Sequence, residues 1–542
     1  MEFKISSRAK KVTFTLMIVG LLAMVWGIFT EQSYIYTEIS EDGTELFFSH
    51  PRHNNGNNEM AEWDQFKIDF TEAAKAMHVI VSEPGAHGTH GTEEHAHDTE
   101  HNGGEVIEGE EHGHGHGHGH GDDHGHHAPF TWTITAHVNH TDEGIAAWHH
   151  HEDQVMPTLK CMVDKHDVGM ADHQHNRFWA NLLVNGFFFF GIALGALFYL
   201  ALHYATESGW GAILLRIFEA VMLVLPFGAA ILLIVFLCGY FELNHIYMWM
   251  DESLLVKWLP SGAENPSFDP LLYQKAGYLN FPFFIIRAVV YIAVFIGFAL
   301  LFRKLSKKED KEGGVRLHFL QFRRGALFLI FFAVFSSMLA WDWLMSIDAH
   351  WFSTLYGWYV FSGIWISAMI MILMTSLYLK SRGYLPQINQ SHIHDVAKWI
   401  FAISFLWSYL WFSQFMLIWY SNIGEEVVYF KQRIMDYKFL FFGTFAINFI
   451  LPMVLMMSRD AKRAWGLIIV IGGIIFVGHW MDVYLLVMPG TMMSNYQIGW
   501  LEIGMFLLFL GVFVFMVLNN LKKAPLIKKN HPMLDESIHH DF

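Results

Sequence analysis

Cysteine and charge are both scarce in this chain of 542 residues. There are only two cysteines, Cys161 and Cys238, and no CxxCH motif. Two thiols cannot hold an iron–sulfur cluster, and without CxxCH no c-type haem is attached. Charged residues make up 16% of the chain, whereas soluble globular proteins average about a quarter. The composition therefore argues against a cytosolic enzyme. Whether the two cysteines form a disulfide is left open.

Long apolar runs account for most of the sequence, which is 53% hydrophobic. A bilayer core of ~30 Å needs about 20 apolar residues in a helix. Ten segments meet this length, and none has the alternating pattern of a barrel strand, so we predict an all-α integral membrane protein with ten transmembrane helices. The predicted spans are 12–30, 178–204, 212–239, 280–302, 321–343, 354–379, 396–420, 438–457, 464–487 and 498–519.

Clusters of Lys and Arg precede the first span and then recur on alternate loops. Basic residues in short loops mark the cytoplasmic side. With both termini cytoplasmic, every cluster falls on one side of the membrane. The first span lacks a clear small-residue cleavage site, so we interpret it as an uncleaved anchor rather than a signal peptide. The sequence thus predicts a multi-pass membrane protein with both termini in the cytoplasm and residues 31–177 outside; the resemblance described below implies that the membrane is the bacterial inner membrane. The clusters lie at 4–11, 303–324, 380–382, 459–463 and 522–529.

An acidic, histidine-rich insert separates the first span from the other nine. Residues 31–177 carry 28 Asp/Glu and 6 Lys/Arg, a net charge of −22, so the rest of the chain is +6 and the total is −16. Within it, 83–127 has 13 His, 11 acidic residues and no Lys or Arg. This low-complexity tract predicts disorder. The flanking stretches 63–81 and 128–140 could form a small periplasmic cap.

The run HGHGHGHGHG at 112–121 offers closely spaced imidazoles. Neutral imidazole is a good ligand for Zn, Cu or Ni, so weak surface binding is one interpretation, and a solvated tail is the other. No structural metal site is assigned. The histidines concerned are His112, His114, His116, His118 and His120.

Histidines inside the predicted spans are few. Only His203 and His479 occur there, the first near the inner end of its helix and the second in the outer half of another. A haem held between membrane helices needs two histidines at one depth, and at ~1.5 Å per residue these two differ in depth. We therefore predict no haem, and no other redox cofactor, on this chain.

Ionisable residues at membrane depth are costly and suggest function. They could relay protons along a hydrated path from the outside, or they could be structural ion pairs; the sequence leaves both open. Arg287, for example, could be the counter-ion of Asp482 or Glu502. Pro226 and Pro452 predict kinked helices, and MPG (488–490) and SFDP (267–270) are candidate chain breaks. The proton-path candidates are Arg216, Glu219, Arg287, Asp342, Asp348, His350, Glu425, His479, Asp482 and Glu502.

Several segments resemble the NrfD-like membrane subunits of bacterial alternative complex III, in particular the ActF group, whose members are named quinone-binding subunit 2. The resemblance covers the nine later spans and the N-terminal anchor, and the HGHG tract departs from it. The segments are AWDWLMSIDAHWFSTLYGWYVFSG (340–363), LWFSQFMLIWYSNIGEE (410–426), MSRDAKR (457–463), GHWMDVYLLVMPG (478–490), NFPFFIIRAVVY (280–291) and ANLLVNGFFFFGIALGALFYLA (180–201).

The resemblance implies an NrfD/PsrC-like fold with two four-helix bundles. The first would span 178–343 and the second 354–487, flanked by the anchor at 1–30 and the helix at 498–519 before a cytoplasmic tail at 520–542. It also implies a complex that oxidises quinol, commonly menaquinol, and reduces a cytochrome c or a terminal oxidase. The implied partners are the NrfD-like paralogue ActC, an iron–sulfur subunit, and multihaem and monohaem cytochrome c subunits.

Three functions follow as hypotheses. The first is a membrane subunit without its own redox cofactor, with a structural and proton-conducting role and no catalytic residue. The second is a quinol-binding redox subunit in its own right, whose quinone-binding residues the sequence does not identify. The third is a metal-ion transporter that gathers its substrate on the histidine-rich loop, which would need His and carboxylate ligands converging at mid-membrane.

Overall fold

The computed structural model describes two compact units of the chain. The larger is formed by residues 1–32, 55–61 and 168–542, and the smaller by 33–54 and 62–167. Within them the described residues are 3–30, four short strands between 36 and 138, and the stretches 176–258, 268–492 and 498–541.

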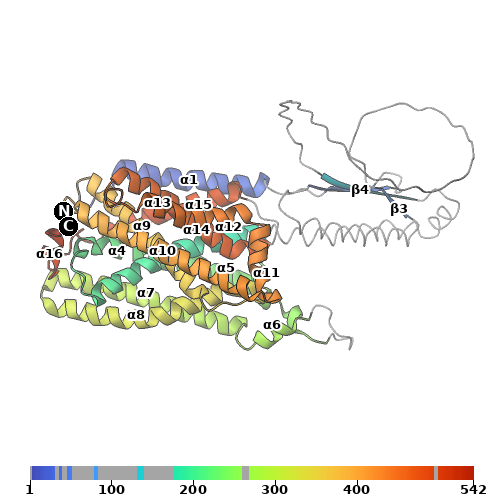
Figure 1. Ribbon diagram of the computed structural model, residues 1–542, viewed down its shortest axis with the longest axis horizontal. Coiled ribbons are helices and arrows are strands. Elements are labelled where there is room, and N and C mark those ends of the chain that lie inside the picture. The colour runs from blue at the N-terminus through green and yellow to red at the C-terminus, as the bar shows by residue number, and fades with distance from the viewer. Residues whose placement is uncertain are drawn as a thin grey trace, which may run out of the picture. The chain divides into compact units, whose positions relative to one another are not determined.

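Ten helices of the larger unit are long and apolar enough to cross a membrane, and Figure 1 shows them packed side by side. This confirms the ten predicted spans and identifies a multi-pass membrane protein. The spans are α1 (Ser7–Thr30), Asn176–Ala205, η1 (Ala212–Leu214) with α4 (Leu215–Met222) and α5 (Leu225–Tyr240), α7 (Phe281–Glu312), α8 (Val315–Trp343), α9 (Tyr356–Ser381), α10 (Gln390–Ser421), α12 (Lys438–Phe445) with η5 (Ala446–Ile450) and α13 (Leu451–Leu455), α14 (Trp465–Met492) and α15 (Trp500–Leu521).

Short helices also occur outside the spans, and none is long enough to cross a bilayer. Five lie in the connections between spans, and α16 lies in the C-terminal segment after the tenth span. They are η2 (Met248–Met250), η3 (Glu252–Leu255), α6 (Pro270–Lys275), η4 (Met345–Asp348), α11 (Gly424–Met435) and α16 (Leu534–Ile538).

Two spans form the centre of the helical unit. The most apolar stretch of Asn176–Ala205 is 94% buried and that of α9 is 83% buried, against 17% for α1. The two central helices touch closely, because a Cβ at Gly195 would lie 2.8 Å from the Cβ of Ala368. Peripheral helices instead expose large apolar side chains, such as Ile330 (67%) and Val454 (71%), to the surrounding lipid.

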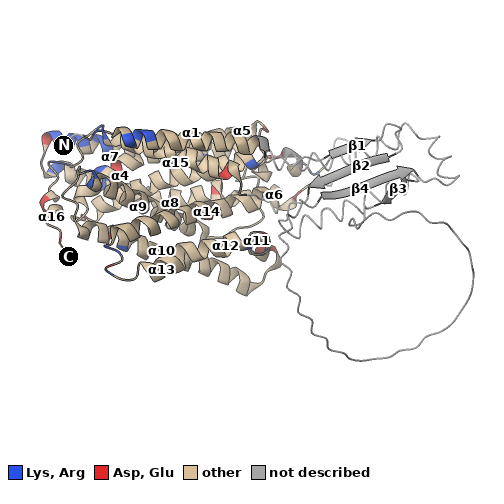
Figure 2. Ribbon diagram, turned by 90° about the horizontal axis from the view of Figure 1, so that it is seen from above, with Lys and Arg blue, Asp and Glu red and all other residues tan. Residues whose placement is uncertain are grey.

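One end of the helical unit holds both termini and most of the Lys and Arg residues (Figure 2). Hydrogen bonds join the terminal segments to the loops there: Tyr384 donates to the carbonyl of Lys4 (3.0 Å), and Asn530 donates to that of Asp310 (3.1 Å). We call this the basic end and the other the opposite end. The predicted segregation of basic loops to one side is therefore present in the fold.

The two prolines expected to kink helices do interrupt them. The third span breaks between α4 and α5, and Pro226 lies in the first turn of α5. In the eighth span the π-helix η5 precedes Pro452. Proline has no N–H to donate to the carbonyl four residues earlier, so the backbone departs from regular α geometry at both places.

The expected break at MPG (488–490) is wrong, because α14 runs through Pro489 to Met492. Proline leaves the carbonyl of Leu485, four residues earlier, without its helical donor. The side chain of Arg433 on α11 supplies a replacement, with its Nε 3.3 Å from that oxygen, and Gln432 donates to the carbonyl of Pro489 (2.9 Å). A neighbouring helix thus stabilises a proline that alone would end α14.

The smaller unit contains an antiparallel sheet in the order β1-β2-β4-β3. Strand β4 pairs with β2 from Glu45↔His137 to Pro51↔Thr131 and with β3 from Val79↔Val138 to Ser82↔Thr135. β3 and β4 fall in the stretches expected to form a cap, so the chain is not helical throughout. The strands are β1 (Tyr36–Ile39), β2 (Glu45–Pro51), β3 (Val79–Ser82) and β4 (Thr131–Val138).

Parts of the predicted insert lie outside the described residues. They include Cys161 and the tract 83–127, which connects β3 to its neighbour β4 along the chain. Cys238 is half-buried near the end of α5. At the C-terminal boundary of the predicted insert, Arg177 is already part of the helix Asn176–Ala205, although the prediction places it in the insert.

Helix α1 packs against α15 through glycines on both helices. A Cβ at Gly20 would lie 2.4 Å from the backbone nitrogen of Leu508, and a Cβ at Gly504 would lie 2.3 Å from that of Met24. Small residues let membrane helices approach until their backbones touch. Since α1 buries little else, these glycines determine its position.

Replacing Gly504 with Leu should separate α1 from α15, because no side-chain rearrangement frees space next to a backbone atom. We expect a loss of about 1–3 kcal/mol of stability, typical of overpacking, measured as a lower thermal unfolding midpoint in detergent. Gly297→Leu on α7 is the control, since no atom lies within 4 Å of a Cβ built there. Equal midpoints for the two variants would contradict this packing account.

Candidate functional site

His479 and Asp482 form a buried pair on one face of α14. They are three residues apart, and Nδ1 of His479 lies 3.9 Å from Oδ2 of Asp482. Two other spans donate hydrogen bonds to the carboxylate: the indole nitrogen of Trp407 on α10 (2.9 Å) and the hydroxyl of Tyr359 on α9. These donors compensate the cost of burying a carboxylate. The sequence predicted the pair but neither donor.

The imidazole of His479 has no protein hydrogen-bond partner at either nitrogen, although the side chain is 1% exposed. Beside it, a cavity of about 10 Å³ is lined by His479, Asp482 and Gly363 among others. That volume is about what one water molecule requires. Because Gly363 has no side chain, space is left near both polar groups: a Cβ there would lie 3.6 Å from each. A single water fits the cavity and could link the imidazole to the carboxylate.

The π-helix η5 places another buried polar group against α14, beside the residue that precedes His479. Asn448, at its centre, is fully buried, and neither amide atom has a hydrogen-bond partner. It packs against Gly478, next to His479 in the chain, where a Cβ would lie 2.2 Å from the amide oxygen. π-Helical turns occur frequently at functional sites. The sequence signal was Pro452, which predicted a distortion but not the side chain it would place.

Arg287 pairs with Asp342, and not with Asp482 or Glu502 as the sequence suggested. Its Nε lies 2.8 Å from one carboxylate oxygen and its Nη2 3.0 Å from the other, and Tyr291 donates to the same carboxylate (3.0 Å). The prediction is wrong because depth along a helix does not determine which faces meet. α7 faces α8, so the guanidinium meets the carboxylate of α8.

Glu502 has a different partner, Arg177, at the start of the second span. The guanidinium binds both carboxylate oxygens, at 2.8 and 2.7 Å, and Asn181 donates a further bond (2.8 Å). Glu502 also accepts from the backbone N–H of Gly499 (2.8 Å) and so caps its own helix. This arrangement joins the second span to the tenth.

The expected cluster of Asp342, Asp348 and His350 separates into independent pairs. Asp348 lies 3.1 Å from Nη2 of Arg433, and His350 lies 2.5 Å from Asp269, the residue that caps α6. Against the effect of burial, hydrogen bonds from the backbone of Leu272, from His350 and from the backbone of Leu271 lower the pKa of Asp269. Glu425 is exposed in the first turn of α11. These contacts connect loops at the opposite end.

At the basic end the predicted pair Arg216 and Glu219 is present and belongs to a larger network. The two side chains are 2.8 Å apart and almost fully buried. Arg303 of α7 binds the same carboxylate (2.6 Å), Ser306 donates to it, and Asp310 binds the second side of Arg216. The sequence missed the three residues of α7 because they lie 84 to 94 positions away in the chain.

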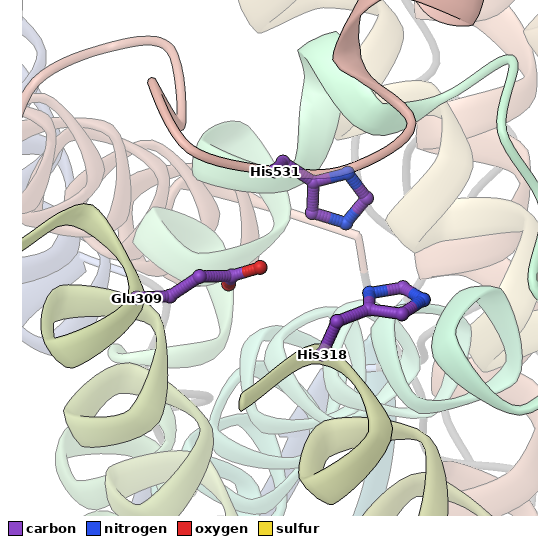
Figure 3. Close-up of side chains that lie close together, drawn as sticks. All are labelled: Glu309, His318 and His531. Carbon is purple, nitrogen blue, oxygen red and sulfur yellow. The ribbon is translucent and has the colours of Figure 1, made fainter. Parts of the chain in front are cut away.

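Next to this network, the C-terminal segment inserts polar side chains into the bundle. Lys528 is fully buried, with Nζ 2.6 Å from Oε2 of Glu309 and 2.6 Å from the hydroxyl of Tyr204. Figure 3 shows Glu309, His318 and His531 facing one another across a small gap. The imidazoles of His318 and His531 are 5.0 Å apart, and Oε1 of Glu309 has no hydrogen-bond partner. This cluster was not predicted, because a tail of Lys and His gives no sign that it will be buried.

Glu309, His318 and His531 form the one group, among the residues described, with three ligand atoms all within 4.8 Å of one another. The electrostatics do not favour a divalent metal there. The neighbouring carboxylates Glu219, Glu309 and Asp310 are already balanced by Arg216, Arg303 and Lys528, and Lys528 occupies one oxygen of Glu309. A divalent ion would add two uncompensated charges to a buried region.

No known protein-family profile matches the chain, and no curated protein sequence matches it either.

Removing one partner of the Arg287–Asp342 pair should destabilise the protein strongly. Asp342→Leu would leave a buried guanidinium without a counter-charge, at a cost of about 3–5 kcal/mol. The double variant Arg287→Met/Asp342→Leu should recover much of that loss. The measurement is a double-mutant cycle on thermal unfolding in detergent. Additive losses would show that the pair contributes nothing beyond its separate side chains.

The C-terminal segment should detach on acidification. Burial, the Lys528 ammonium and the nearby imidazoles of His318 and His203 lower the pKa of His531 to about 2. Between the ordinary value near 6.5 and that value the detached segment binds a proton that the docked one does not. The free energy that neutral His531 contributes to docking is therefore fully present above about pH 6.5. Below that pH it decreases by up to about 1.4 kcal/mol per pH unit.

Spin-label mobility at the exposed position His539→Cys, in a chain whose native cysteines are serines, measures this docking. We expect a more mobile label at pH 5 than at pH 7.5, and a smaller difference once His531→Asn removes the titrating group. A label equally immobile at both pH values would disprove the linkage.

Proposed function

We propose that this chain is the ActF-like membrane subunit of a respiratory quinol:electron-acceptor oxidoreductase of the alternative complex III kind. In this proposal it holds the complex in the bilayer and conducts protons, while partner subunits carry haem c and iron–sulfur clusters. The NrfD/PsrC-like fold with two four-helix bundles belongs to the same proposal. Support comes from the ten spans and from the segments that resemble this group of proteins.

The resembling segments contain the polar sites. Asp342 lies in 340–363 and its partner Arg287 in 280–291, and His479 and Asp482 lie in 478–490. Buried carboxylates are expensive in a membrane, so these segments do more than fill space with apolar side chains. Asp342 joins two spans through its ion pair, and His479 with Asp482 is the candidate for proton transfer.

The observation that carries the proton-conducting role is the unsatisfied imidazole of His479 beside a carboxylate and a water-sized cavity. Imidazole can accept a proton at one nitrogen and release it from the other. Asp482 is about 15 Å along the helix from the end of α14 at Met492, by helical rise. The pair is thus suited to pass protons between the opposite end and the bundle interior.

The other ionisable candidates at the opposite end have the geometry of structural pairs. Each of two ion pairs joins one guanidinium to one carboxylate at hydrogen-bond distance: Arg287 with Asp342, and Arg177 with Glu502. Their side chains have protein partners and no need of water. We therefore assign proton transfer to His479 and Asp482 and structural roles to the two Arg–carboxylate pairs.

The size of the cavity supports proton transfer rather than quinol oxidation at this site. Ligand pockets usually measure about 300–1,000 Å³, whereas the cavity beside Asp482 measures about 10 Å³. A quinone ring would require several helices to move.

A metal-transport role is not favoured either, because the group Glu309, His318 and His531 lies under the C-terminal segment at the basic end.

The basic end faces the cytoplasm in this proposal, following the positive-inside rule. Both termini are then cytoplasmic, residues 31–177 are periplasmic, and the His479–Asp482 pair communicates with the periplasm. A complex that releases protons from quinol toward that side requires such a path or a site close to the surface.

The proposal predicts that the chain, extracted in mild detergent, co-purifies with multihaem cytochrome c. Haem absorbance in the affinity-purified fraction measures this. A chain that never travels with such a cytochrome would exclude the proposed complex. Deleting residues 84–127, whose removal leaves β3 and β4 intact, should not change the result or metal uptake by cells.

Asp482→Asn should lower quinol-oxidation turnover of the complex by about ten-fold or more, as loss of a positioned proton-transfer group does. The amount of quinone bound to the complex should not change. Glu425→Gln, an exposed carboxylate at the same end, is the matched control and should leave turnover unchanged. Quinone density packed against Asp482 or His479 would instead support a quinol site on this chain.

A further inference from the structure

An apolar groove lies between α1, α9 and α15, close to the basic end of the bundle. Its volume is about 310 Å³. It is the larger of the two cavities noted here and plays no part in the proposed proton path. Its lining is formed by Arg8, Ala9, Val12, Thr13, Met371, Met374, Thr375, Tyr378, Arg382, Val514, Val517 and Leu518.

The groove changes from charged to apolar along its length. Arg8 lies in the first turn of α1 and Arg382 directly follows the last residue of α9, so both guanidiniums mark the basic end. Met371 is eleven residues before Arg382 in the sequence, which corresponds to about 16 Å of helix toward the middle of the membrane. One end of the groove is therefore cationic and the remainder hydrophobic.

The two arginines are both exposed and are the only charged residues in the lining. No Asp or Glu of the lining neutralises them. Arg382 also lies 5.8 Å from the ring of Tyr378. Guanidinium groups bind phosphate through paired hydrogen bonds that a neutral ligand cannot match. The positive charges of Arg8 and Arg382 thus favour binding of an anion at the level of the lipid headgroups.

We propose that this groove binds one anionic phospholipid, with its phosphate between Arg8 and Arg382. An acyl chain would lie along Val12, Met374 and Val514 toward the bilayer centre. Basic pockets between membrane helices on the cytoplasmic side are typical sites for anionic headgroups. A quinone would fill the apolar part but leave two cations without a counter-charge. The inference does not depend on the proposed function.

The lipid would connect α1 with α9, which face each other across the groove. α1 contacts the rest of the bundle through α15, and the groove separates its first turn from the end of α9. A phospholipid anchored on Arg8 and Arg382 joins the two through its phosphate, and its chain fills the space between. Its role is therefore to hold the N-terminal anchor against the central helix.

Native mass spectrometry of the full chain in mild detergent tests this proposal. The probes are phosphatidylglycerol and phosphatidylethanolamine added in equal amounts. We expect one phosphatidylglycerol to be retained with about ten-fold preference, which corresponds to 1.4 kcal/mol, and Arg8→Gln/Arg382→Gln to abolish the preference. Arg323→Gln/Arg324→Gln, which removes two exposed charges at the same end, is the matched control and should keep it.

Thr375→Trp provides a second test, because it fills the groove without changing its charge. It should release the lipid while thermal unfolding midpoints confirm that all variants are folded. Equal retention of the two lipids by the unmodified chain would overturn the proposal. Undiminished phosphatidylglycerol binding by Arg8→Gln/Arg382→Gln, or a quinone retained in preference to both lipids, would also overturn it.

Discussion

The cost of an unpaired charge in hydrocarbon is the constraint on which this structure depends. A buried ion that loses its partner costs several kcal/mol, and a membrane offers no water to replace it. Glu219, Asp342 and Glu502 each meet an arginine from another span at hydrogen-bond distance. These contacts act between helices that apolar packing alone would not orient, because lipid is as apolar as their surfaces.

His479 differs from these pairs. The carboxylate beside it is satisfied by a tryptophan and a tyrosine, which carry no charge, and the imidazole has no protein partner. A packing role would leave no reason for both nitrogens to stay unpaired beside a space for water. Gly363 leaves space beside both polar groups, and the π-helix packs Asn448 against Gly478, the residue before His479. The site therefore has the properties that the proposed proton transfer requires, and it lies among structural pairs.

The sequence was sufficient for the ten spans, the basic end and the pairing of Arg216 with Glu219, because each depends on local composition or on helical spacing. It was not sufficient for contacts between spans. The counter-ions considered for Arg287 were Asp482 and Glu502, and Asp342 was not among them, because the sequence does not show which faces of α7 and α8 meet. Lys528 and His531 looked like a solvated tail, and only the fold shows them buried against Glu309. Pro489 was expected to break the helix. Arg433 donates to the carbonyl of Leu485, which the missing N–H of Pro489 leaves without its helical donor. Because Arg433 lies 56 residues earlier in the chain, the sequence does not show this contact.

The central claim is that this chain carries protons without carrying electrons. The most direct measurement is the number of protons released per electron by the complex reconstituted in liposomes, with and without His479→Gln. The account predicts that the variant continues to transfer electrons at a reduced rate and releases fewer protons per electron than the unmodified complex. An unchanged ratio, with electron transfer intact, would contradict the claim and leave this chain a structural subunit.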